Sequence, residues 1–460
     1  MIESILSSFA LIVLSTGMLG LTCFSWRAAR RIFNVPVVAD LIFFFVSIKV
    51  IMYYLLPTFM RMASDYQFER MDGVAIADLI KVYSIELISW TVWATVLLWV
   101  FSAVSRNKQK IRVDDFVHLR YPESKIILVL VALGFVAFQI TTLLKIELGI
   151  FFEVFKTLFF FAGLTAGPFL AFMSLRYYSK PLFILGICTA LLGMLSLATR
   201  GAIVYFLLFS LFLAWFILRD NKSKAIVCSM ISVLVIVYFT LGGLLFGSIF
   251  IDETGSMRID AGIAAEKTGG RSPLEEFEWR LGAATRLGTS FIRLYDRGEG
   301  AGFNPIKNSL KGFLPRSINP DKPHPSTLDG DDIYSMGMYI IYREIYGYDT
   351  FSMVEFPTGA HFYWEFGILG VLIFSAISGL YVALCAHFFA KLGVVALPLM
   401  VAIFKPWGYV DPKIWVSDIA MQIYQIVLPL ILLVCIIRFM RYGSKVLAVA
   451  GITRTRKILG

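Results

Sequence analysis

The segment GFLPRSINPDKPHPSTLDGDD, from Gly312 to Asp332, combines four of the chain's 16 prolines with the cations Arg316 and Lys322 and the imidazole of His324. Guanidinium groups offer paired donors that match phosphate oxygens, and prolines restrict the backbone that carries them. The segment therefore predicts a stiff, cationic surface suited to a phosphorylated ligand. A proline-rich loop with solvated charges is the alternative interpretation.

A second cation stands in LATRGAIVYF, between two apolar runs joined by almost no polar sequence. This spacing places Arg200 at a membrane–water boundary. An interfacial arginine often extends only to lipid headgroups. At this position it would also meet the diphosphate of a lipid-linked substrate.

Residues 273–298 predict an amphipathic helix. At 100° per residue, one broad face collects the apolar side chains Phe277, Leu281, Ala284, Leu287, Phe291 and Leu294. Arg286, Arg293 and Arg297 fall on the opposite side. This arginine row would bind a phosphorylated ligand. Alternatively, its members are solvated, contact headgroups or pair with Glu275, Glu276 and Glu278.

His361 and Glu365, in EFPTGAHFYWEFGILG, are four residues apart and share one face if a helix has begun there. The pair is a weak metal signal, because no H-E-x-x-H motif or second histidine cluster accompanies it. A later segment, KPWGYVDPKIWVSD, mixes interfacial aromatic residues with the charges Lys405, Asp411 and Lys413.

The elements that must position these residues are membrane spans. The chain is 58% hydrophobic and 16% charged, whereas soluble domains are nearer half apolar and a quarter charged. We expect an all-α polytopic integral membrane protein with about 11 transmembrane helices. The predicted spans are 4–26, 37–60, 79–104, 126–146, 151–175, 181–198, 201–218, 225–250, 366–390, 393–409 and 422–440. The first is interpreted as a retained span and not a cleaved signal peptide.

The distribution of charge predicts the topology. One set of alternate connections, together with the C-terminal segment, holds half of the 42 Lys and Arg residues and few acids. By the positive-inside rule these parts are cytoplasmic. The N-terminus and one large loop are then extracytoplasmic. The net charge of +10 thus reports topology and does not indicate a nucleic-acid partner.

Three regions follow from this topology. Residues 1–250 form transmembrane helices 1–8, residues 251–355 the large periplasmic loop, and residues 356–460 helices 9–11 with a cytoplasmic tail. All five cysteines lie in apolar spans, so the loop has no disulfide to stabilise it and must pack on the bundle. Within the spans, Lys49 and Glu86 are predicted to form a structural ion pair, with proton coupling as the alternative.

The sequence lacks the motifs of common hydrolases and nucleotide-binding enzymes. There is no G-x-S-x-G, no Walker loop and no Gly-rich turn after a strand. External cations beside lipid, without a nucleotide site, favour group transfer from an activated lipid pyrophosphate. The cations would stabilise the departing diphosphate, while a carboxylate or imidazole takes the proton of an attacking sugar hydroxyl.

The order of T-R-G between two closely spaced spans, a loop with F-L-P-R and P-D-K-P, and then P-T-G and F-G-x-x-G before a span resembles the Wzy-type O-antigen (oligosaccharide repeat-unit) polymerases. The resemblance covers residues 197–370. It implies a GT-C-like bundle in the bacterial inner membrane that polymerises undecaprenyl-pyrophosphate-linked repeat units on the periplasmic face. The lipid-linked oligosaccharide is then both donor and acceptor, and a chain-length regulator is an expected partner.

The resemblance implies Arg200 and Arg316 as pyrophosphate ligands, followed by Lys322. Further predicted substrate contacts are Arg271, Arg280, Arg286, Arg293 and Lys405. The general base is left open among His324, His361, Glu365 and Glu278. The acids of the first outer loop, Asp65, Glu69 and Asp72, are scattered, so we predict a metal-independent enzyme without a cofactor.

Two other functions fit parts of the pattern. An O-antigen ligase would use the same lipid donor and fold, with a lipid A-core acceptor; the proline-rich signature favours the polymerase. A flippase or transporter for the lipid-linked glycan would need symmetric halves and more intramembrane charges than the sequence displays.

Overall fold

A computed structural model gives the fold. It describes residues 2–63, 76–106, 108–111, 122–143, 150–177, 179–196, 200–218, 220–246, 249–251, 257–259, 285, 287–311, 357–404, 412–440 and 442.

Nearly all of the described residues are helical. The elements are α1 (Ile2–Ile32), α2 (Pro36–Val50), η1 (Ile51–Leu55), α3 (Leu56–Ala63), α5 (Ile76–Ser105), α7 (Pro122–Leu143), α8 (Ile150–Tyr177), α9 (Lys180–Ser196), α10 (Arg200–Ile217), α11 (Asn221–Phe246), β1 (Ile249–Ile251), β2 (Met257–Ile259), α14 (Asn304–Lys311), α16 (Thr358–Ala390), η2 (Gly393–Val395), α17 (Ala396–Phe404), α18 (Val416–Gln422) and η3 (Ile423–Val427). Residues 287–296 and 428–440 are also helical. The strands β1 and β2 pair antiparallel just after α11 and are a small exception to the all-α expectation.

The long apolar runs became helices because a helix satisfies every backbone polar group within the segment. In the part of the chain that the structure describes, five helical stretches are long and apolar enough to cross a membrane: Phe9–Ile32, Pro36–Phe59, Ile76–Ser105, Thr358–Ala390 and Asp418–Met440. The molecule thus has the character of a helical membrane protein. A helix coincides with each of the predicted spans, but the number 11 stays a prediction.

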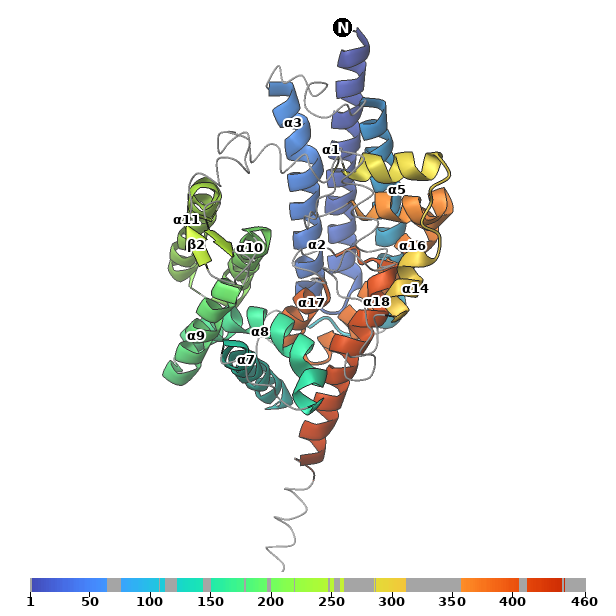
Figure 1. Cartoon of the computed structure of the whole chain (residues 1–460). Helices are drawn as coiled ribbons and strands as arrows, with labels where there is room; N and C mark the ends of the chain where they lie inside the picture. Colours follow the sequence, from blue (N-terminus) through green and yellow to red (C-terminus); the bar gives the residue numbers. More distant parts are fainter. Residues whose placement is uncertain are drawn as a thin grey trace, which may run out of the picture.

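Helices α1, α2, α5 and α16 form one packed group, with α16 lying along α5 (Figure 1). Helices α7 to α11 gather beside it, and α17 joins the two groups because it contacts both α8 and α16. Aromatic side chains fill the junction: Phe44 of α2 packs on Phe212 of α10, and Phe45 lies against Phe209 and Phe404. The core is therefore continuous across both groups.

A sharp break divides α16. Phe366 and Gly367 leave the helical region, with φ of −144° and 61°. The positive φ suits glycine, and the Tyr295 ring lies where a Cβ on Gly367 would stand. The predicted start of the ninth span, residue 366, falls at this break. The break therefore divides α16 into a short first helix (358–366) and a longer second helix (368–390).

At the break, backbone carbonyl oxygens of α16 lose their partners within the helix, and another segment supplies hydrogen-bond donors for them. The backbone N–H groups of Ala301 and Gly302 donate to the carbonyl oxygens of Trp364 and Glu365, at 3.0 and 3.1 Å. Irregular backbone at membrane depth is tolerated where protein buries it in this way. Residues 299–302 thus fix the break in place.

Residues 287–296 form a helix within the predicted loop helix, but their burial is not confined to one face, because Thr289, Ser290 and Ile292 are also at most 2% exposed. Leu287, Phe291 and Leu294 are at most 2% exposed and pack on Ala360 and Trp364. In Figure 1 this yellow segment lies across the orange start of α16. Residues 287–296 therefore pack on the bundle.

Candidate functional site

A buried ion pair lies at the centre of the region where α5 and the start of α16 meet. Lys413 Nζ is 2.7 Å from Glu86 Oε2, and the two side chains are 0% and 1% exposed. The ammonium also donates to Ser89 Oγ at 2.8 Å and faces the Trp90 ring at 4.4 Å. A buried charge needs such partners to offset its lost hydration.

Glu86 also holds the beginning of α16. Its Oε1 accepts hydrogen bonds from the backbone N–H groups of Gly359 and Ala360, the latter at 3.1 Å. A helix N-terminus has unpaired donors and a positive dipole, so a carboxylate is its natural cap. One carboxylate thus joins α5, α16 and the segment before α18.

This arrangement differs from the sequence prediction that Glu86 pairs with Lys49. Lys49 is buried in α2 at 2% exposure, but the ion pair that the structure gives Glu86 is with Lys413. Apolar patterning placed both α2 and α5 in the membrane and contained no information on which buried cation faces Glu86.

His361 and Glu365 do lie on one face of a helix, as their spacing predicts. His361 Nδ1 is 3.3 Å from Glu365 Oε1, and the side chains are 6% and 1% exposed. Pro357 and Thr358 begin the helix early enough to include both. The imidazole and the carboxylate are therefore close and buried directly behind the Glu86-capped helix start, while Nδ1 makes no hydrogen bond within the described residues.

Aromatic rings fix the imidazole. The Trp415 ring stacks on His361 at 4.3 Å with an interplanar angle of 6°. Phe291 and Trp364 approach the same imidazole edge-on, at 5.4 and 5.7 Å. Rings from two other segments and from its own helix thus surround His361, and the ring is held in one orientation.

Glu365 has capacity left for a ligand. Its Oε2 is buried and has no hydrogen-bond partner within the described residues. Asp418, at the start of α18 and 1% exposed, lies near enough to act on it electrostatically. Buried polar atoms are usually paired, so an unsatisfied carboxylate oxygen beside a fixed imidazole suggests a place where a substrate hydroxyl donates.

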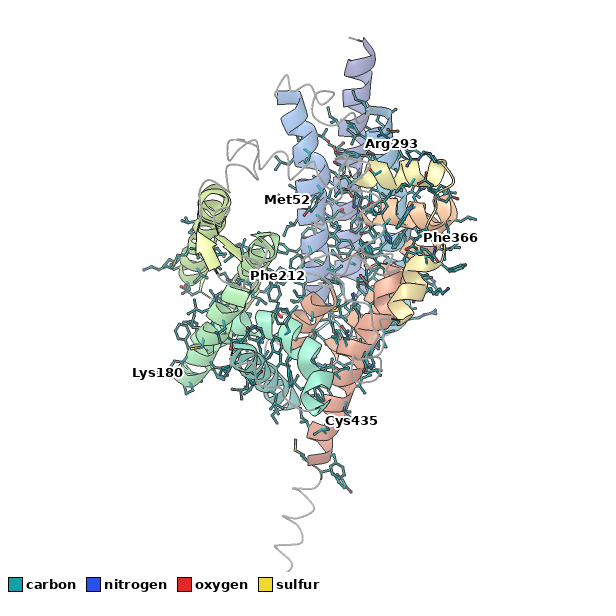
Figure 2. All side chains as sticks on the ribbon, in the orientation of Figure 1. Met52, Lys180, Phe212, Arg293, Phe366 and Cys435 are labelled. Carbon is teal, nitrogen blue, oxygen red and sulfur yellow. The ribbon has the colours of Figure 1, made fainter. Side chains whose placement is uncertain are left out.

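Two surface ion pairs attach residues 287–296 to the bundle above this site. Arg293 donates to Asp78 Oδ2 from Nε and Nη2, at 2.9 and 2.7 Å. Lys81 pairs with Asp296, which also accepts from the Tyr363 hydroxyl at 3.0 Å. Arg293 lies at the upper end of the bundle and Phe366 below it on the same side (Figure 2).

The remaining predicted site residues are placed as follows. Arg200 is the first residue of α10, but its side chain is not described. His324, Glu278, Arg316, Lys322, Arg271, Arg280, Arg286 and Lys405 lie outside the described residues. The structure therefore brings together His361 and Glu365, and it pairs Arg293 with an acid.

Sequence reasoning did not select Lys413, Asp418 or Trp415 as site residues. Lys413 stands in an apolar, aromatic stretch between Pro412 and Ile414. A cation in that setting needs a buried acid as its partner, and Glu86 in its span needs a cation. The sequence could therefore have predicted the Lys413–Glu86 pair by matching these two residues.

The comparisons with known proteins give no further identification. No family model matches the chain, and neither a curated protein nor a solved structure matches it.

Proposed function

We propose that this protein is a membrane glycosyltransferase that polymerises lipid-linked oligosaccharide repeat units. It transfers the growing glycan from one undecaprenyl pyrophosphate carrier to a sugar hydroxyl of the next lipid-linked unit. Within this proposal the chain is an inner-membrane, GT-C-like bundle of about 11 spans with its site on the periplasmic side. The helical bundle with five long apolar helices is consistent with that fold.

The observation that carries the proposal is the buried His361–Glu365 pair. Glycosyl transfer to a hydroxyl needs a base within hydrogen-bonding reach of the attacking oxygen. Nδ1 lies 3.3 Å from Glu365 Oε1 without a hydrogen bond between them, and we assign the other ring nitrogen to the acceptor hydroxyl. The carboxylate orients the imidazole and stabilises the positive charge that develops as it takes the proton, and Trp415 keeps the ring in place.

Cations complete the proposed reaction by stabilising the departing diphosphate. Arg200 and Arg316 are assigned this role, with Lys322 beside them, on the resemblance alone. Arg293 fits it less well than the sequence suggested, because its guanidinium is already bound to Asp78. We assign Arg293 the role of fixing the loop helix over the site.

The test uses full-length protein reconstituted with purified lipid-linked repeat units, with glycan length read on gels. His361→Gln should lower the rate of chain extension by about 10²–10⁴-fold, the usual contribution of a positioned base. The control is His118→Gln, which changes a histidine that the topology places on the opposite side of the membrane. Full activity of a well-folded His361→Gln protein would remove His361 from the mechanism.

A transporter of the same lipid-linked glycan is the second candidate, and a specific observation favours it. The described residues bury more ionisable groups than the sequence suggested, since Glu365, Lys413 and Asp418 join Lys49 and Glu86. Broken helices such as α16 also occur at transporter binding sites. Formation of new glycosidic bonds in the reconstituted assay separates the enzyme from the transporter.

A further inference from the structure

One face of α16 remains apolar and uncovered along the span. Ile373, Ile377, Leu380, Leu384 and Phe388 recur at intervals of three and four residues and are 38–53% exposed. We call this set the α16 stripe. The same spacing continues to Lys391, the residue that caps the helix. An exposed stripe of this kind within a membrane span faces acyl chains.

The stripe ends where two other helices also end. Phe33, just after α1, stacks on Phe101 of α5 at 4.1 Å. Asn34 N donates to Ser105 Oγ at 3.1 Å, and Ile111 N donates to Asn34 O at 2.8 Å. These contacts hold residues 108–111 against the ends of α1 and α5. The position of Lys108 is therefore set by the fold.

Helices α5 and α16 lie side by side in the same direction, since Ser89 Oγ is 2.6 Å from Ser375 Oγ and Gly379 packs on the Trp93 backbone. The end of α5 before Lys108 therefore lies beside the end of α16 at Lys391. Lys108 and Lys391 both act electrostatically on His387, which is one turn before the end of α16. Both lysines are exposed, and no ion pair of theirs is found within the described residues. The described stretches 99–106, 108–111 and 384–395 contain no Asp or Glu. Among these described residues, the positive charge at this end of α16 has no neighbouring acid in sequence.

We propose that this surface binds an anionic glycerophospholipid. Its phosphate lies between the ammonium groups of Lys108 and Lys391, and an acyl chain lies along Phe388, Leu384 and Leu380. Charge complementarity selects the headgroup, because basic sites between spans bind anionic lipids. The apolar stripe directly beside the lysines selects a lipid over a free phosphate. This inference rests on the membrane character of the chain and not on the proposed glycosyltransferase activity.

The test titrates the detergent-purified full-length protein with phosphatidylglycerol or phosphatidylcholine and counts bound lipid by native mass spectrometry. Phosphatidylglycerol should bind more tightly. Each of Lys108→Gln and Lys391→Gln should weaken its binding about fivefold, the factor that corresponds to one surface cation near an anionic lipid. Phosphatidylcholine binding should change little, and millimolar inorganic phosphate should not displace the lipid.

The matched control is the double variant Lys180→Gln/Lys222→Gln, which removes two exposed cations from the starts of α9 and α11. It should leave phosphatidylglycerol binding at the wild-type value. Equal binding of the two lipids would overturn the proposal. So would an equal loss in the control, which would show a non-specific charge effect, or displacement by inorganic phosphate, which would show a site for free anions.

Discussion

At the scale of single residues, Glu86 links the largest number of separate parts of the site. It pairs with Lys413 through one oxygen and caps α16 through the other. Removing one partner of a buried pair leaves the other charge without solvent or counter-ion, and that state costs more than loss of the attraction itself. Loss of one member alone should therefore destabilise the local fold, whereas replacement of both members by apolar residues should cost less.

Glu86→Gln keeps the shape of the side chain and its acceptor for the helix start, but it removes the charge. We expect the free energy of unfolding to fall by about 3–5 kcal/mol, measured by chemical denaturation in detergent. The double variant Glu86→Gln/Lys413→Met should recover part of this loss, since no charge then stays buried alone. Glu299→Gln, in an exposed pair with Arg297, is the control and should cost under about 1 kcal/mol. An equal, small effect of both single variants would contradict the account.

Some of these contacts could be predicted and others could not. The spacing of His361 and Glu365 is local, so a helical period was enough to place them together. The contact between Glu86 and Lys413 joins residues far apart in sequence and depends on how α5 packs against α16 and the segment before α18. Hydropathy predicts that Glu86 and Lys413 each lie in or near a span, but it does not predict which spans pack against each other. The same limit applies to Asp418 beside Glu365.

At the scale of elements, the break in α16 decides where the site lies. The first part of the helix folds back over the second, so that the carbonyl oxygen of Phe362 lies where a Cβ on Gly370 would stand. Phe362 and Phe366 then both pack on Phe374. Without this reversal, His361 and Glu365 would extend away from Glu86 along a straight helix.

Gly370→Ala should therefore destabilise the protein by about 1–3 kcal/mol, the usual cost of forcing extra volume into a packed region. The measurement is the unfolding transition in detergent. Gly20→Ala is the matched control, because a Cβ on this glycine of α1 meets no atom within 4 Å. If the two alanine variants unfold alike, the close approach at Gly370 does not exist. The sequence predicted a span that begins at residue 366, but a reversal depends on contacts with Tyr295 and Ala301.

At the scale of the whole molecule, charge counting predicts that residues 287–296 and the lysines at the end of α16 lie on opposite sides of the membrane. Positive charge at the ends of α1, α5 and α16 predicts that these ends are cytoplasmic. The described part of each predicted span contains helix, which is compatible with the predicted topology. Within the described residues, five stretches have the length and hydropathy of a membrane span. The orientation followed from charge counting, which the fold does not test.

Fusion of a reporter that is active only outside the cytoplasm would test the orientation. A fusion after Glu299 should be active, whereas fusions after Lys222 and Lys391 should be inactive. Each of these three positions is exposed. Activity after Lys391 and none after Glu299 would reverse the topology and place the His361–Glu365 pair on the wrong side for a periplasmic enzyme.

The most direct measurement of the central claim is the fate of lipid-linked repeat units in liposomes that contain the purified protein and no energy source. The account predicts a ladder of longer glycans, each still linked to lipid. One carrier diphosphate should be released for each new glycosidic bond. Translocation of single units across the bilayer without new bonds would contradict it and establish the transporter, and transfer only to added lipid A-core would establish the ligase.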